Sequence, residues 1–564
     1  PRVLALHRTD TNPPSLTQTR ARWRGIGRVE LDRPALAWLV SLAIAAAYLV
    51  LFVVKLAHNI TALGWNPDVA SAFLLPETLV GTGTGGHTVL ASAGQWVPLW
   101  FGLLTARLPL HRELWDIAPT ACFIASALIV GWSVKQLAGT RAAVLAVLIG
   151  LVASPIALTF FMAPFSHNTV YPCTALVGAY IVWMAQAHDR CPLAARLALP
   201  PLLGVAIGTC LASDFLLAAT AVMPLTFTAI VACTRRERRS RLIALSALST
   251  VAVAIPVAKL TSTTMGSLGF KTLPTPVEIA SPSELPARAQ LMFKGLKELF
   301  NGYLGTEAPG TLHTELGLAS DVVMSAALLA LIFVGARTTY RFIAAGLRKS
   351  GTGTPPELAR SLHIIFWVSS AVTACGAFWI AGEGAMTTHE SYYAVTIFSV
   401  AAVIALQLPS GARASWLIPA GASVFFAASL VGLTEDYVNI SAPLARSAAI
   451  ITRIAAANHV QVGYTNWGDA SGLTWGTHDR VIVRPLMQCA NPQGVDLCPG
   501  FQAYVPSWYV PEQRHTFLLV DATGIEIRAL PRGLGKPLAT YAFGSMQMYI
   551  YPYDIASQLG PAAG

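Results

Sequence analysis

Residues 35–56 of the 564-residue chain read ALAWLVSLAIAAAYLVLFVVKL, an apolar run with one charged side chain, Lys55. An α-helix of this length crosses the roughly 30 Å of hydrocarbon in a bilayer. Similar runs follow at 115–134, 142–163, 169–187, 197–212, 215–233, 242–260, 318–336, 362–381, 391–408 and 415–434. The sequence therefore predicts an all-α polytopic membrane protein with about 11 transmembrane helices.

The composition supports this fold class. Apolar residues make up 54% of the chain and charged residues 12%, whereas an average soluble protein is roughly 45–50% apolar and about 25% charged. The composition excludes a set of soluble globular domains. With only 8 cysteines and with 44 glycines that show no period, it also excludes a disulfide scaffold and a collagen.

The distribution of Lys and Arg predicts the orientation. Cytoplasmic loops of membrane proteins retain positive charge, and an inward amino terminus puts 22 basic residues inside and 8 in the outer loops. We therefore expect a cytoplasmic tail at 1–34, a transmembrane domain at 35–434 with outer loops 57–113 and 263–317, and an outward carboxyl terminus. Basic residues at lipid headgroups explain the net charge of +10 without nucleic acid.

Residues 435–564 have the composition of a soluble domain. A helical pattern at 442–457 precedes strand-like runs at 460–464, 481–485, 516–520 and 546–551, which predicts a small α/β domain outside the membrane. The region holds Cys489 and Cys498. Two cysteines alone in an outward-facing domain favour a disulfide, with two free thiols as the alternative.

The sequence contains neither the phosphate-binding GxxxxGK(S/T) motif of ATPases nor the HExxH motif of zinc hydrolases. The strongest remaining candidates for functional residues lie in the first outer loop. Pro67 and Asp68 precede a short apolar run and predict a turn that leads into a helix. Asp68 would lie near the helix amino terminus, where peptide dipoles favour a carboxylate. By position alone Asp68 could be only a helix cap, and Glu77 a solvated acid at headgroup level.

Several segments carry a resemblance to a known family. The outer loop opens with an Asp and continues with an amphipathic stretch containing Pro98, Trp100 and Phe101. A short outer turn follows the third span at 163–168, and a polar-aromatic motif at 389–393 opens a late span. This layout, over about residues 35–410, resembles the C-type superfamily of integral-membrane glycosyltransferases, which includes protein O-mannosyltransferases and lipid A aminoarabinose transferases.

The resemblance implies a polyprenyl-phosphate sugar donor and a catalytic base, Asp68, that takes a proton from the acceptor hydroxyl. The candidates for binding the donor phosphate or the substrate are Lys55, Arg107, Arg112, His167, His389, Tyr392 and Asp214. The lysine could equally snorkel to the headgroups, the arginines could dock a helix to lipid, and the histidines could be ordinary helix-end residues. Asp214, between two apolar runs, is either a turn residue or a substrate contact.

The resulting hypothesis is an inverting glycosyltransferase of the plasma membrane, with its site on the outer face and a glycan, glycolipid or protein hydroxyl as acceptor. Mannose and arabinose are the natural guesses for the sugar. Val69 follows Asp68 where relatives often have a second acid, so no metal ligand is assigned and a divalent metal stays possible. The alternatives are a transporter or lipid flippase, and a non-catalytic subunit of envelope assembly.

Overall fold

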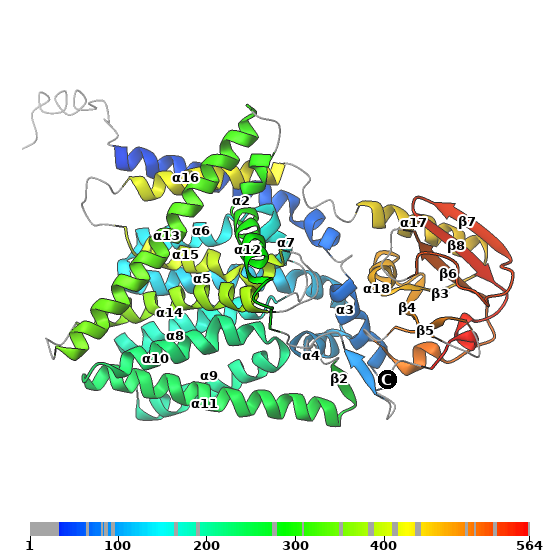
Figure 1. Cartoon of the computed structure of the whole chain (residues 1–564), viewed down its shortest axis with the longest axis horizontal. Coiled ribbons are helices and arrows are strands. Elements are labelled where there is room, and N and C mark those ends of the chain that lie inside the picture. Colours follow the sequence, from blue (N-terminus) through cyan, green and yellow to red (C-terminus); the bar gives the residue numbers. More distant parts are fainter. Residues whose placement is uncertain are drawn as a thin grey trace, which may run out of the picture.

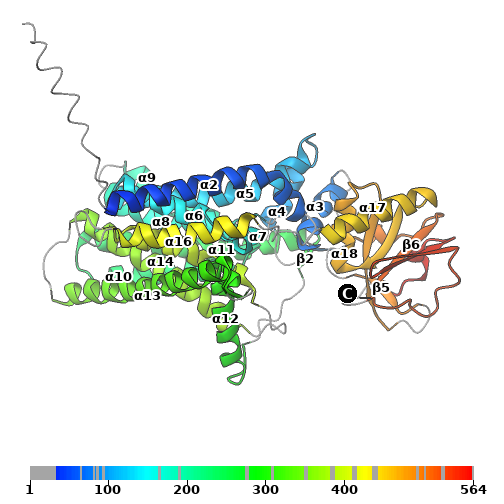
Figure 2. The same cartoon turned by 90° about the horizontal axis from the view of Figure 1, so that it is seen from above.

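In a computed structural model of the chain, the apolar runs form a bundle of long helices, and the carboxyl-terminal region forms a sheet domain at one end of the bundle (Figures 1 and 2). The structure describes residues 33–63, 67–80, 83, 88–91, 96–162, 167–187, 192–272, 279–306, 310–348, 354–381, 388–408, 416–434, 442–490, 495–500, 504–522 and 527–561.

Every apolar run falls on a helix. The bundle comprises α2 (Arg33–Leu63), α5 (His111–Ala138), α6 (Thr140–Leu151), α7 (Pro155–Met162), α8 (Val170–Ala187), α9 (Leu193–Ser213), η2 (Ala218–Val222), α10 (Met223–Cys233), α11 (Arg238–Ser267), α13 (Leu312–Leu347), α14 (Pro355–Ile380), α15 (Val395–Ala405) and α16 (Leu417–Thr434). Among the described residues, 7 helices are long and apolar enough to cross a membrane, or 8 if the bent pair α6 and α7 is one span. The other predicted spans lie on shorter helices, so the number 11 stays a prediction.

The run at 142–163 is not one straight helix. It breaks between α6 and α7 with a bend of 85°. The Ser154 hydroxyl accepts a hydrogen bond from the Ala157 amide at 3.1 Å, and Pro155 occupies the first position of α7. A serine cap followed by proline starts a new helix, which explains the break.

The two outer loops of the prediction contain regular structure. The first holds α3 (Pro67–Leu79), β1 (Val89–Ala91) and α4 (Trp96–Thr105), and the second holds β2 (Phe270–Thr272), α12 (Leu285–Leu299) and η3 (Gly302–Thr306). Strands β1 and β2 pair in parallel, with Val89 opposite Phe270. The two segments are therefore joined, although about 180 residues separate them in the sequence.

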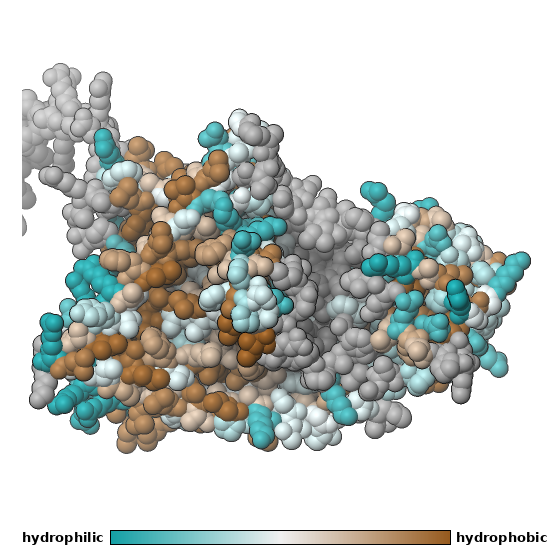
Figure 3. Space-filling model, in the orientation of Figure 1, coloured by the Kyte–Doolittle hydropathy of each residue, from teal (hydrophilic) through white to brown (hydrophobic). Residues whose placement is uncertain are grey.

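Helices of the bundle approach closely where their residues are small. A Cβ atom on Gly204 of α9 would lie 2.7 Å from the Thr250 carbonyl oxygen of α11, and one on Gly208 would lie 2.5 Å from that of Ala254. Small residues four positions apart allow such contact between membrane helices. On the outside of the bundle, by contrast, large apolar side chains cover much of the surface (Figure 3), as expected for a surface that faces lipid.

The carboxyl-terminal region is a mixed sheet with helices, as its pattern predicts. Its elements are α17 (Ala442–Ala457), β3 (Val462–Asn466), α18 (Trp467–Gly476), β4 (Ile482–Gln488), β5 (Leu497–Pro499), η6 (Pro506–Tyr509), β6 (Thr516–Asp521), β7 (Ala539–Phe543), β8 (Met546–Tyr551) and η7 (Ile555–Gln558). The strand order is β5-β4-β3-β6-β8-β7. Strand β3 runs parallel to β4 and β6, and the outer pairs are antiparallel.

The central strand β6 shows why the sheet holds together. Phe517 and Leu519 face one hydrophobic cluster, shared with α17 and α18, whereas Leu518 and Val520 face a second cluster on the other side. Both faces of β6 are therefore covered, which accounts for its uninterrupted apolar sequence.

Candidate functional site

A histidine–aspartate pair lies where α8 begins and α9 ends. The Asp214 carboxylate approaches His167 Nδ1 at 2.6 Å and accepts a hydrogen bond from the Leu216 amide at 3.0 Å. His167 has a left-handed backbone, φ 58°, and its carbonyl oxygen accepts from the Val170 amide. Asp214 is thus a turn residue and also the partner of a second candidate residue.

The late polar-aromatic motif meets this pair. Tyr392 ends η4 (Glu390–Tyr392), and its ring centroid lies 5.7 Å from that of His167 and 5.8 Å from that of His389. The nearby Tyr171 hydroxyl of α8 donates to the Ser391 carbonyl oxygen at 3.2 Å. The structure therefore brings together His167, Asp214, His389 and Tyr392 from three separate turns. We call these four residues the junction cluster.

The segment that carries Asp68 approaches the same helix end. Helix α3 begins at Pro67, as predicted, and puts Asp68 in its first turn; the side chain of Asp68 lies outside the described part of the chain. Helix α3 packs on α4, and the Val97 amide at the start of α4 donates to the Ser213 hydroxyl at 3.0 Å. Ser213 directly precedes Asp214, so α4 connects α3 to the junction cluster.

The three basic candidates, Lys55, Arg107 and Arg112, have different surroundings. Lys55 Nζ donates to the Thr434 carbonyl oxygen at 3.3 Å, near the last turn of α16, where peptide dipoles favour a cation. Arg107 is exposed. Arg112 stacks on the Trp475 ring, 3.9 Å from its centroid, and lies 3.9 Å from the Asp479 carboxylate. In this arrangement Arg112 contacts the sheet domain, which the sequence did not indicate.

A pair of glutamates lies beside the junction cluster and was not a sequence candidate. Glu298 of α12 lies near Glu390 of η4, whose side chain packs against the same helix at Gly295. Burial and Glu390 together raise the pKa of Glu298 to about 7, against a small opposing effect of Lys294. Glu390 itself is buried. A carboxyl pair of this kind holds a proton near neutral pH, and nothing in two glutamates 92 positions apart reveals it beforehand.

The second charged group lies between α3 and the sheet domain. Partial burial and the charge of Asp479 raise the pKa of Glu77, and the charge of Arg112 partly opposes this rise. Burial likewise raises the pKa of Asp479. Glu77 itself is exposed, and its assignment as a solvated acid stays a prediction.

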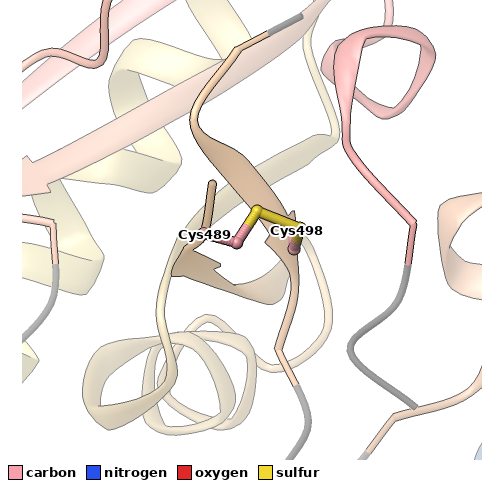
Figure 4. Close-up of a disulfide and its surroundings, with 2 residues drawn as sticks. All are labelled: Cys489 and Cys498. Atoms are coloured by element: carbon pink, nitrogen blue, oxygen red, sulfur yellow. A yellow bond between two sulfur atoms is a disulfide. The ribbon is translucent and has the colours of Figure 1, made fainter. Parts of the chain in front are cut away.

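Cys489 and Cys498 form a disulfide that ties β5 to the end of β4 (Figure 4). Among the described residues, no three His, Cys, Asp or Glu side chains gather in a group that could hold a metal ion.

No protein-family model and no curated protein matches the sequence. Similar solved structures exist. ArnT from Cupriavidus metallidurans bound to undecaprenyl phosphate is 13% identical with a TM-score of 0.48, over 91% of this chain and 99% of that one. The Archaeoglobus fulgidus oligosaccharyltransferase in complex with zinc and sulfate is 13% identical with a TM-score of 0.43, over 86% and 68%. The archaeal oligosaccharyltransferase AglB from the same organism, with an inhibitory peptide and a dolichol-phosphate, is 14% identical with a TM-score of 0.41, over 84% and 69%.

Proposed function

We propose that the protein is a membrane glycosyltransferase that transfers a sugar from a polyprenyl-phosphate donor to a hydroxyl acceptor. The observation that carries the proposal is the junction cluster, which joins three turns at the bundle end that also bears α3 and the sheet domain (Figure 1). The sequence resemblance supplies the class of donor, and the geometry supplies a polar site at the end of apolar helices.

The histidine–aspartate pair suits a phosphate. A carboxylate on Nδ1 stabilises the protonated imidazole and leaves Nε2–H to donate to another group. A hydrogen bond from a cationic donor to a phosphate oxygen is shorter and stronger than a neutral one. His167 then binds the donor phosphate, and Asp214 orients the His167 ring. The Tyr392 ring lies beside both histidines and is the aromatic neighbour of the proposed site.

Asp68 acts as the general base. Its carboxylate accepts the proton of the acceptor hydroxyl, and the acceptor oxygen forms a bond to the anomeric carbon of the sugar. The bond between that carbon and the phosphate oxygen breaks, and polyprenyl phosphate leaves with the electron pair. A single displacement of this kind inverts the anomeric configuration.

The finer assignments follow the same proposal. The donor carries mannose or arabinose, and the acceptor is an envelope glycan, glycolipid or protein hydroxyl. The site lies on the outer face of a plasma membrane, on the side of the sheet domain and its disulfide. Arg107, Lys55 and a divalent metal are further candidates for contact with the donor phosphate.

Transfer by the purified full-length chain in lipid vesicles tests the proposal. We would offer a panel of radiolabelled polyprenyl-phosphate sugars with envelope acceptors, and compare the wild type with Asp68→Asn. We expect transfer from one donor and a loss of about 10²–10⁴-fold in the variant. Glu77→Gln, which changes an acid on the same helix, is the matched control and should keep most activity. Absence of transfer from every donor would instead favour a transporter or an assembly subunit.

A further inference from the structure

The sheet domain touches the helix that carries Asp68. Helix α18 packs on α3 in both views of the molecule (Figures 1 and 2). At the contact, Trp475 near the end of α18 meets Phe73 of α3, with ring centroids 4.5 Å apart and the ring planes nearly perpendicular at 89°. The exposed fractions of Phe73 and Trp475 are only 2% and 3%.

Helix α5 of the bundle also packs against Phe73. Trp115 and His111 of α5 also contact Phe73, with ring centroids 5.5 Å and 4.5 Å away. His111 Nδ1 is 2.8 Å from the Thr105 hydroxyl at the end of α4. Phe73 is therefore enclosed by the sheet domain on one side and by α5 on the other.

Arg112 of α5 binds the sheet domain beside Trp475. Its guanidinium stacks on Trp475, donates a hydrogen bond to the Trp475 carbonyl oxygen, and lies 3.9 Å from the Asp479 carboxylate. A cation held by a ring face, a carbonyl and a carboxylate has a defined position. Asp479 adopts a left-handed backbone, φ 57°, which directs the short turn after α18.

Phe73 and Asp68 belong to one short helix. They are five residues apart on α3, so the helix transmits the position of Phe73 to Asp68 without an intervening joint. The far end of α3 is also fixed, because Pro76 packs against Gly102 of α4, where a Cβ atom would have no room. The contact through Trp475 comes from the sheet domain, and Leu75 and Leu79 of α3 also share a buried cluster with Val505 of that domain.

We propose that the sheet domain positions the catalytic helix: Trp475, with Arg112 and Asp479, holds Phe73 and so sets the place of α3, the helix that carries Asp68. This inference rests on the proposed glycosyltransferase function. Trp475 is a positioning residue, since it acts through α3. A displacement of a general base by about 1 Å costs about 10²-fold in rate, so loss of the contact should slow the reaction without weakening donor binding.

Two measurements on the full-length protein in lipid nanodiscs test this inference. The first is the separation of kcat from KM for the donor, and the second is hydrogen exchange of the α3 amides. For Trp475→Ala we expect kcat to fall about 10–100-fold, the donor KM to change less than twofold, and the α3 amides to exchange faster. Trp475→Phe keeps an aromatic edge on Phe73 and should recover most of the rate.

The controls separate positioning from loss of the domain. Phe543→Ala weakens the hydrophobic packing of β7, the edge strand farthest in the sheet order from β5, and should leave α3 exchange and kcat unchanged. Asp479→Asn tolerates the left-handed backbone and removes only the charge, so the domain stays folded. We expect a two- to fivefold lower kcat and slightly faster α3 exchange.

The outcomes distinguish the two proposals. If Trp475→Ala leaves both α3 exchange and kcat unchanged, the positioning role is wrong. If Phe543→Ala loosens α3 as much as Trp475→Ala, the effect belongs to the domain as a whole and the assignment to Trp475 is wrong. If the wild type transfers no sugar, the proposed function fails, and α3 exchange still shows whether Trp475 holds the helix.

Discussion

In the helical bundle, large apolar side chains such as Leu260 of α11 and Leu329 of α13 are exposed, and Ser370 is fully buried between helices. In the sheet domain the central strand β6 instead buries Phe517 and Leu519 in an apolar cluster. Lipid is as apolar as leucine, so membrane helices gain little from burying leucine against each other and rely on close packing and hydrogen bonds. The sheet domain faces water and gains its stability from apolar burial. Helix α3 contacts both regions, through α4 of the helical part and α18 of the sheet domain.

The largest expected effect tests the two modes of stabilisation directly. Phe517 is buried against Gly463, where a side chain would have no space, and Phe517→Ala should destabilise the sheet domain by about 3–5 kcal/mol. Ser370 donates to the Thr220 carbonyl oxygen at 2.7 Å, and Ser370→Ala should cost the bundle about 0.6 kcal/mol. Hydrogen exchange of the β6 and α14 amides in nanodiscs measures the two losses of stability. Equal losses would show that the sheet domain and the bundle do not differ in what stabilises them.

The second effect concerns the junction cluster at the end of the bundle. His167→Ala should lower kcat by about 10²–10³-fold, because the leaving phosphate loses a hydrogen-bond donor. Asp214→Asn keeps an acceptor for the Leu216 amide and should have a smaller effect. Thr174→Val is the control: it removes a 3.1 Å hydrogen bond to Thr220 inside the bundle, and it should change kcat less than twofold in the vesicle assay.

The third effect is confined to the sheet domain. Replacing Cys489 and Cys498 together by alanine should destabilise that domain by about 2–3 kcal/mol, as expected for a short closed loop. Amides of α14 serve as the internal control and should exchange as in the wild type. Alkylation without reduction, followed by mass measurement, checks the bond itself; labelling of both residues in the native protein would contradict it.

The smallest effect is a pH dependence at the bundle end. Folding raises the pKa of Glu298 from its ordinary 4.5 to about 7, so the folded state holds a proton that the unfolded state releases. The resulting stabilisation is complete below about pH 4.5 and is lost as the pH rises through about 7. Amides of α12 should then exchange faster, after correction for the intrinsic rate. Glu298→Gln should flatten this dependence, and an unchanged slope would remove Glu298 as its source.

Much of the fold follows from the sequence because solvent acts on each segment separately. An apolar run prefers lipid whatever its neighbours are, so all the predicted runs lie on helices, and the α/β pattern after residue 441 appears as a mixed sheet. The bend at Ser154 and Pro155 had a readable signal, a serine before a proline. Helix α12 had no comparable signal in the sequence, because it is amphipathic and contains no apolar run long enough to cross a membrane.

The sequence by itself determined the membrane character, the candidate residues and the composition of the sheet domain, because these depend on residue type and local period. Only the tertiary structure decided which candidates meet. It joined His167 to Asp214 and Tyr392, and it gave Arg112 to the sheet domain. Such contacts depend on the relative placement of helices and turns far apart in the chain, and small residues and backbone turns set that placement without a pattern of their own.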